Sequence, residues 1–148
     1  MFIPFSGGCA CGAIRYTCAA EPIIAWNCHC RDCQRASGGA FAPVFYVATS
    51  AWTVTGEIKY YDVQAKSGNI VSRGFCPECG SPLCARLSTL PTVVSIRIGS
   101  LDDPSGVQPT LDIWTVSAQP WEYINPARSK VETQPSKEQL EELFTPHR

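Results

Sequence analysis

Cysteine is the residue type that stands out in this sequence, both in number and in spacing. The 148-residue chain has nine cysteines, and seven of them fall into three clusters: Cys9/Cys11, Cys28/Cys30/Cys33 and Cys76/Cys79. Thiolate sulfur is a preferred ligand of zinc and is also a nucleophile. Nine is an odd number, so a fully paired disulfide framework would leave one thiol over. The clusters therefore favour metal binding or thiol chemistry over disulfide bonding.

The third cluster has the pattern of a zinc knuckle. Cys76 and Cys79 lie in the sequence Phe-Cys-Pro-Glu-Cys-Gly, in which a tight turn would aim both sulfurs at one point and Gly80 could take a left-handed backbone. A knuckle supplies two ligands, whereas a structural zinc is bound by four. Cys9 and Cys11, which are flanked by glycines, can supply the other two. The spacing thus predicts one four-cysteine structural zinc site.

The middle cluster predicts a different kind of site. Cys28, Cys30 and Cys33 offer three ligands from one short stretch, and three protein ligands with an open fourth position is the arrangement of a catalytic zinc. Arg31 and Arg35 are four residues apart, so they could offset the negative charge of three thiolates or attract an anionic ligand.

The residues alone leave two other interpretations of the middle cluster open. Cys18 or Cys84 could act as a fourth ligand and close the site as a second structural zinc, and His29 is a weaker candidate for that role. Alternatively, the cluster could be a metal-free site of reactive thiols. Cys18 continues the apolar face of Ile14 and Tyr16, which favours a place in the core for this thiol.

The elements that must position these clusters are mostly short strands. Alternation of apolar and polar residues, together with β-prone composition, predicts strands within 14–18, 23–27, 41–48, 58–63, 71–75, 83–87, 93–98 and 111–116. The stretch His29–Ser37 has no internal Pro or Gly and ends at Gly38-Gly39, so we expect a short helix after the middle cluster. The sequence Asp102-Asp103-Pro104 is typical of a solvent-exposed turn.

A second helix is predicted at the C-terminal end. Ser136 and Gln139 have the spacing of a capping box, and Leu140, Leu143 and Phe144 form one apolar stripe. We expect the stripe to pack either on the domain itself or on a second subunit, in which case the protein would be a homodimer. The polar stretch 126–135 is expected to be a loose connection to this helix.

Composition excludes several classes of protein. The chain has 12 basic and 13 acidic residues and no basic block, so we expect no nucleic-acid partner. No apolar run approaches the roughly 18 residues of a membrane span, and the first residues do not resemble a signal peptide. We therefore expect a cytoplasmic protein with no membrane partner. Residues 1–148 are expected to be one domain, with a core of about 5–123 and an extension over 124–148.

The cysteine motifs and their order resemble a known family. Cys9-Ala-Cys11-Gly, Cys28-His-Cys30-Arg-Asp-Cys33 and Cys76-Pro-Glu-Cys79-Gly resemble the motifs of the glutathione-dependent formaldehyde-activating enzyme (GFA) family, which includes centromere protein V. The segments Gly99–Pro104 and Pro120-Trp121 are also similar to signatures of that family.

The resemblance implies a fold, two metals and an activity. The fold would be mainly β, of the mammalian-suppressor-of-Sec-four type, with small antiparallel sheets tied by zinc. Matched position by position, the ligands of the family's structural zinc are Cys9, Cys11, Cys76 and Cys79, and those of its catalytic zinc are Cys28, Cys30 and Cys33. The implied activity is that of a carbon–sulfur lyase, the condensation of formaldehyde with glutathione to S-(hydroxymethyl)glutathione. Arg31 and Arg35 would then be candidates to bind a glutathione carboxylate.

A non-catalytic alternative is a protein-interaction module with two structural zinc sites. A closed middle site would favour the module, whereas an open one would favour the enzyme with a thiol and an aldehyde as its small-molecule partners.

Overall fold

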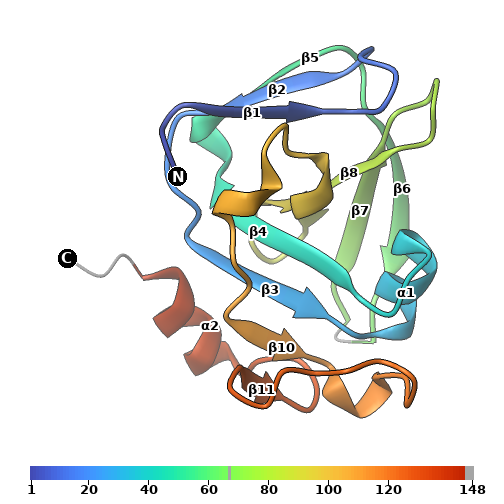
Figure 1. Cartoon of the computed structure of the whole chain (residues 1–148), viewed down its shortest axis with the longest axis vertical. Coiled ribbons are helices and arrows are strands. Elements are labelled where there is room, and N and C mark those ends of the chain that lie inside the picture. The colour runs from blue at the N-terminus through green and yellow to red at the C-terminus, as the bar shows by residue number, and fades with distance from the viewer. Residues whose placement is uncertain (67, 146–148) are drawn as a thin grey trace.

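Strands dominate the architecture of the protein. The computed structural model describes residues 1–66 and 68–145, and within them the strands form two sheets (Figure 1). The first sheet has the order β1-β2-β5 and consists of β1 (Phe5–Gly8), β2 (Arg15–Cys18) and β5 (Trp52–Thr55). The predicted mainly β class is confirmed.

The second sheet has the order β11-β10-β3-β4-β9-β8-β7-β6. Its strands are β3 (Ile24–Cys28), β4 (Ala42–Ala48), β6 (Lys59–Gln64), β7 (Ile70–Phe75), β8 (Pro82–Leu87), β9 (Val93–Arg97), β10 (Leu111–Ile113) and β11 (Ser129–Val131). This sheet is larger than the small antiparallel sheets that we expected, and β10 pairs in parallel with both β3 and β11. The parallel pairing arises because the connection 98–110 returns the chain to the end of the sheet at which β9 began.

The central strands of the second sheet are buried on both faces, and β4 illustrates why. Phe45 and Val47 point into a core between the two sheets, whereas Val44 and Tyr46 point to the opposite face. Successive side chains of a strand alternate between faces, so a strand that is apolar throughout requires cover on both sides. The first sheet covers one face. The other face carries the candidate site described below.

Two α-helices accompany the sheets. The first, α1 (Arg31–Ser37), follows β3 directly, as expected, and α2 (Lys137–Phe144) is the last element of the described chain (Figure 1). Short 3-10 turns occur at Thr49–Ala51, Ile98–Ser100, Pro104–Gly106 and Thr115–Ser117. None of the helices in the described ranges has the length and apolar character needed to cross a membrane.

The capping box predicted for α2 is present. Gln139 N donates to Ser136 Oγ (3.1 Å), and Ser136 N donates to Gln139 Oε1 (2.8 Å). The apolar stripe of α2 packs on the chain itself, since the Phe144 ring lies 5.2 Å from the ring of Tyr46 and 6.2 Å from that of Trp26. The stripe is thus accounted for within one subunit.

The expectation of a loose connection over 126–135 is wrong. This segment contains β11, and Arg128 within it donates two hydrogen bonds to the buried Asp112. Gln134 accepts a hydrogen bond from the indole of Trp114 (3.2 Å). The segment is held by parallel strand pairing and by side-chain bonds to residues far away in sequence, which no local pattern could indicate.

Candidate metal centres

The first and third cysteine clusters meet at one end of the molecule. The Sγ atoms of Cys9, Cys11, Cys76 and Cys79 all lie within 4.8 Å of one another, with Cys9–Cys11 at 3.6 Å and Cys11–Cys76 at 3.8 Å. Four sulfurs placed about 2.3 Å from a tetrahedral zinc would be about 3.8 Å apart. The spacing of these thiols therefore fits the four-cysteine zinc site expected from the sequence.

Local backbone geometry and one serine hold this four-cysteine cluster together. Gly12 and Gly80 follow the two cysteine pairs and have positive φ angles of 80° and 76°, which glycine adopts without strain. Ala10 N donates to Ser81 Oγ (3.0 Å), so the serine hydroxyl is free to donate to Cys79 Sγ at 3.1 Å. That hydrogen bond, together with bonds from the backbone of Ser81 and Cys11, lowers the pKa of Cys79 to about 5. Sequence reasoning missed Ser81, although its place just after the knuckle was a usable signal.

The middle cluster forms where β3 passes into α1. Cys28 ends β3, Cys30 is the N-cap residue of α1, and Cys33 lies in its first turn. Their sulfurs lie within 4.8 Å of one another, and Cys33 N donates to Cys30 Sγ (3.3 Å), which satisfies one of the free N–H groups of the helix start. The strand-to-helix junction thus turns three thiols of one short segment toward a common point.

No other Cys, His, Asp or Glu ligand atom in the described chain joins this three-cysteine cluster. Cys18 and Cys84, the thiols considered as a fourth ligand, are buried in the core between the sheets, on the opposite face of the large sheet. Cys18 is therefore the core residue that its alternation with Ile14 and Tyr16 predicted. The three thiols of the middle cluster have room for a further ligand.

A buried polar network supports the three-cysteine cluster from behind. His29, between two of the cysteines, is 1% exposed, and its Nε2 lies 2.8 Å from Asp112 Oδ1. Asp112 also accepts hydrogen bonds from Arg128 and from Asn27. Burial raises the pKa of Asp112, but the bonds from His29, Arg128 and Asn27 outweigh it and lower the pKa overall. His29 thus binds Asp112 and does not join the three-cysteine cluster.

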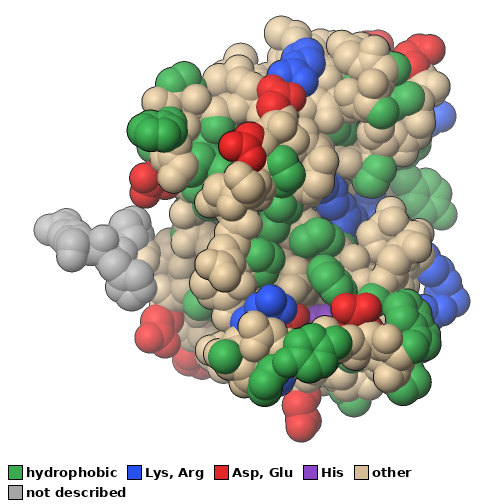
Figure 2. Space-filling model, in the orientation of Figure 1, with side chains coloured by type: hydrophobic (Ala, Val, Ile, Leu, Met, Phe, Trp, Pro, Cys, Tyr) green, Lys and Arg blue, Asp and Glu red, His purple; other side chains and the backbone are tan. Residues whose placement is uncertain are grey.

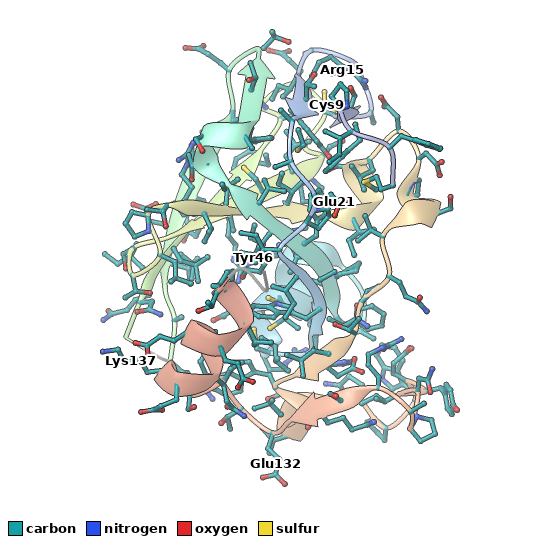
Figure 3. The ribbon with its side chains drawn as sticks, turned by 90° about the vertical axis from the view of Figure 1, so that its left-hand side faces the viewer. Cys9, Arg15, Glu21, Tyr46, Glu132 and Lys137 are labelled. Carbon is teal, nitrogen blue, oxygen red and sulfur yellow. The ribbon has the colours of Figure 1, made fainter. Side chains whose placement is uncertain are left out.

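The three-cysteine cluster opens into a cavity of about 340 Å³ on the second face of the large sheet. Its apolar wall includes Trp26, Val44 and Tyr46, the residues next to α2. Figure 3 shows Tyr46 beside this helix, with Cys9 and Arg15 at the other end of the molecule. The two cysteine clusters are therefore separate sites, and the three-cysteine one has a space in which a small molecule can bind.

The cavity is strongly cationic. Among the described residues, five basic side chains and one acidic side chain, Asp32, line it; the basic residues are Arg31, Arg35, Lys66, Arg73 and Arg97. Arg31 and Arg35, which the sequence singled out, are exposed at its edge, and Arg31 donates to Gln34 Oε1. In the space-filling view, basic side chains (blue) are seen within the indentation on the right-hand side (Figure 2). The charge of the cavity suits an anionic ligand.

Arg73 and Arg97 are cavity residues that sequence reasoning missed. Arg73 Nη2 lies 3.7 Å from Cys33 Sγ, and Arg97 is buried with only 7% of its surface exposed. Bonds from the Cys28 and Cys30 thiols and the charges of Arg73 and Arg97 place the pKa of Cys33 well below its ordinary value. The available signal for Arg97 was the alternation around Ser95 and Arg97 in 93–98, which predicted a polar strand face but not its burial. Arg73 was predicted to share a strand face with Val71 and Phe75, which gave no sign of a charged cavity.

A search of solved structures finds a protein with a similar fold. The crystal structure of a Rhodobacter sphaeroides protein, a structural-genomics target, matches with a TM-score of 0.53 and 22% sequence identity, covering 70% of this chain and 91% of that chain. At this identity the likeness shows the fold alone. A search of curated proteins finds no match.

Family membership rests on the sequence profile. The profile described as "glutathione-dependent formaldehyde-activating enzyme" matches residues 4–117, a range that includes all seven clustered cysteines. The match covers most of the chain, and both cysteine clusters assemble in the structure. The chain therefore belongs to the glutathione-dependent formaldehyde-activating enzyme family.

Proposed function

We propose that the protein is a zinc-dependent enzyme of the carbon–sulfur lyase type that joins a formaldehyde-like aldehyde to glutathione or a related thiol. The observation that carries this proposal is the three-cysteine cluster, whose thiols open into a cationic cavity instead of being enclosed by a fourth ligand. Family membership supports glutathione and formaldehyde as the reference substrates. A reducing compartment such as the cytoplasm would keep the thiols available.

The residues present fit two zinc ions with different tasks. Cys9, Cys11, Cys76 and Cys79 would hold a structural zinc, and their sulfur spacing and four-ligand set suit it. Cys28, Cys30 and Cys33 would hold the second. When bound there, zinc supplies an open coordination position and a positive charge that favours the thiolate form of a thiol substrate.

The chain's own residues would position the substrates. Arg73 and Arg97 lie beside Cys33 and offset the charge of three thiolates. Arg31 and Arg35 at the edge of the cavity can pair with glutathione carboxylates, and the apolar wall excludes water from the reacting atoms. In the reaction the thiol sulfur forms a bond to the aldehyde carbon, the carbonyl double bond becomes a single bond, and the thiol proton ends on that oxygen.

The proposal is tested by measuring zinc per chain and the rate of exchange between free formaldehyde and its glutathione adduct by NMR. We expect two zincs and a faster exchange with the full-length protein. The Cys30→Ser variant should bind one zinc fewer and should no longer accelerate the exchange. Cys18→Ala, which changes a buried thiol outside both clusters, is the matched control and should keep both.

The alternative is a non-catalytic module with two structural zincs, and the same measurement decides between them. Two zincs that resist chelation equally, with no change in exchange rate for any thiol–aldehyde pair, would overturn the enzyme proposal. The open cavity beside the three-cysteine cluster favours the enzyme.

A further inference from the structure

Arg97 is a buried cation whose donors lack partners. It lies at the end of β9, lines the cavity and is 7% exposed, and its Nε and Nη1 have no hydrogen-bond partner among the described residues. Leaving buried donors of a charged group unpaired is costly. Arg97 also lines the cavity, so its charge is placed to attract an anion that enters there.

Arg73 provides a second donor group in the same part of the cavity. Its Nη2 lies 3.7 Å from Cys33 Sγ, and its charge lowers the pKa of Arg97, as does burial, which has the larger effect. Two cations in one small cavity repel each other unless anions lie nearby. Five basic side chains and one acidic side chain among the described residues line the cavity, so its charge favours an anion beside the two arginines.

We propose that Arg73 and Arg97 form a carboxylate subsite, and that the aldehyde substrate of this protein carries a carboxylate on its carbonyl carbon, as glyoxylate does. This inference rests on the proposed function and names its substrate class. Guanidinium groups bind carboxylates through charge-assisted hydrogen bonds, and both Arg73 and Arg97 line the cavity.

Position argues for the aldehyde as the source of this carboxylate. Arg73 lies next to Cys33, which would be a ligand of the second zinc, so an anion bound to Arg73 would be close to the place where zinc would bind the thiol substrate. A carboxylate attached directly to the carbonyl carbon reaches this place when that carbon meets the thiol. The carboxylates of glutathione are several bonds from its sulfur and fit Arg31 and Arg35, which are exposed at the edge of the cavity.

The step is the same addition as for formaldehyde. The glutathione sulfur forms a bond to the aldehyde carbon, the carbonyl π electrons move to its oxygen, and the thiol proton is transferred there to give a hemithioacetal. The carboxylate stays intact on Arg73 and Arg97, and no oxidant or reductant is required.

The test compares two aldehydes that differ in charge. Binding of glyoxylate and of uncharged glycolaldehyde to the zinc-loaded full-length protein is measured by calorimetry without thiol, and exchange with glutathione is measured by NMR. We expect Arg73→Met and Arg97→Met each to lower the ratio of glyoxylate to glycolaldehyde affinity about tenfold. Arg97→Lys should lower it less. Arg86→Met is the matched control: Arg86 is exposed, lies between the cavity residues Ala85 and Leu87 and does not line the cavity.

Each outcome decides the inference. An unchanged affinity ratio in Arg73→Met and Arg97→Lys overturns it, even if zinc content falls, because the arginines would then only balance the thiolates. Equal binding of inorganic phosphate and glyoxylate would also overturn it, since the subsite would then accept any oxyanion. Arginine-dependent glyoxylate binding without exchange for any aldehyde would confirm the subsite and refute the proposed function. Thermal unfolding and zinc content are measured for each variant, and Arg73, which is only half-buried, provides the test if Arg97→Met does not fold.

Discussion

The two cysteine clusters are built from the same side chain but in different ways. The four-cysteine cluster joins two glycine-flanked turns that are 65 residues apart between Cys11 and Cys76, and its neighbours are backbone N–H groups and Ser81. The three-cysteine cluster comes from one strand-to-helix junction, opens into a cavity and faces Arg73. A metal bound by distant segments acts on folding, whereas a metal bound by one segment beside a cavity can act on ligands.

The largest effect on stability is expected from replacing a ligand of the four-cysteine cluster. Cys76 is fully buried, so Cys76→Ser should remove a ligand from the tie between the two turns. Structural zinc contributes about 10–16 kcal/mol of apparent binding free energy, comparable with the whole stability of a domain. We expect Cys76→Ser to lose its cooperative thermal transition, followed by circular dichroism. A normal transition with one zinc fewer would show that this cluster does not support the fold.

The next largest effect on stability is expected from the buried Asp112, which binds His29 and Arg128 beside the three-cysteine cluster. Asp112→Ala leaves His29 buried without its partner and releases Arg128, and breaking such a buried pair costs about 3 kcal/mol. We expect this loss in the free energy of unfolding by urea, together with weaker binding of the second zinc. Asp103→Ala, at an exposed position, is the control. Equal stabilities of the two variants would contradict the supporting role of Asp112.

Cys30→Ser tests whether the three-cysteine cluster, unlike the four-cysteine cluster, can lose its metal while the fold stays intact. A serine hydroxyl can accept the hydrogen bond from Cys33 N that Cys30 Sγ accepts now, and serine is a preferred N-cap residue. We expect the free energy of unfolding, compared between forms that hold zinc only in the four-cysteine cluster, to change by less than about 1 kcal/mol. Zinc content measured by mass spectrometry under native conditions should fall by one. Loss of both zincs would show that the two clusters are coupled.

The smallest effect is a pH dependence beside the four-cysteine cluster. The hydrogen bonds from Arg15 to Asp102 lower the pKa of this carboxyl, so its contribution to stability is present above the ordinary pKa of Asp and is lost as pH falls through the folded-state value. Both side chains are about half exposed, so we expect a slight effect that added salt weakens. In Asp102→Asn the melting temperature should therefore fall less steeply as the pH is lowered through the acid range. An unchanged dependence on pH would show that the Arg15–Asp102 pair does not contribute to stability.

Much of the candidate site could be predicted because its chemistry is local. Cys28, Cys30 and Cys33 are close in sequence, and the knuckle at Cys76 and Cys79 has recognisable turn residues, so residue type and spacing were sufficient. The strands over 14–18 and 93–98 were predicted from alternation, and the strand over 41–48 from its apolar, β-prone composition. Strands β1 and β11 were missed because their short segments do not alternate clearly, whereas β5 was missed although its four residues alternate.

The arginines show where local reasoning ends. Alternation around Ser95 and Arg97 indicates a polar face, and a polar strand face is ordinarily the one in water. In the structure both side chains are buried, because the cavity on that face is also lined by α1 and by Ala65, Lys66 and Asn69. Asp112 likewise lies in a strand whose sequence gave no sign of a role. Its importance follows from its contacts with His29 and Arg128, which belong to other segments.

The sequence by itself determined that the protein is mainly β and which seven thiols form its candidate metal sites, because short-range spacing and alternation carry that information. Only the tertiary structure decided that the three-cysteine cluster stays open, that Cys18 and Cys84 lie on the far side of the sheet, and that Arg73 and Arg97 face the cavity. Burial and charge depend on which strands become neighbours. That pairing joins segments tens of residues apart, which no local pattern specifies.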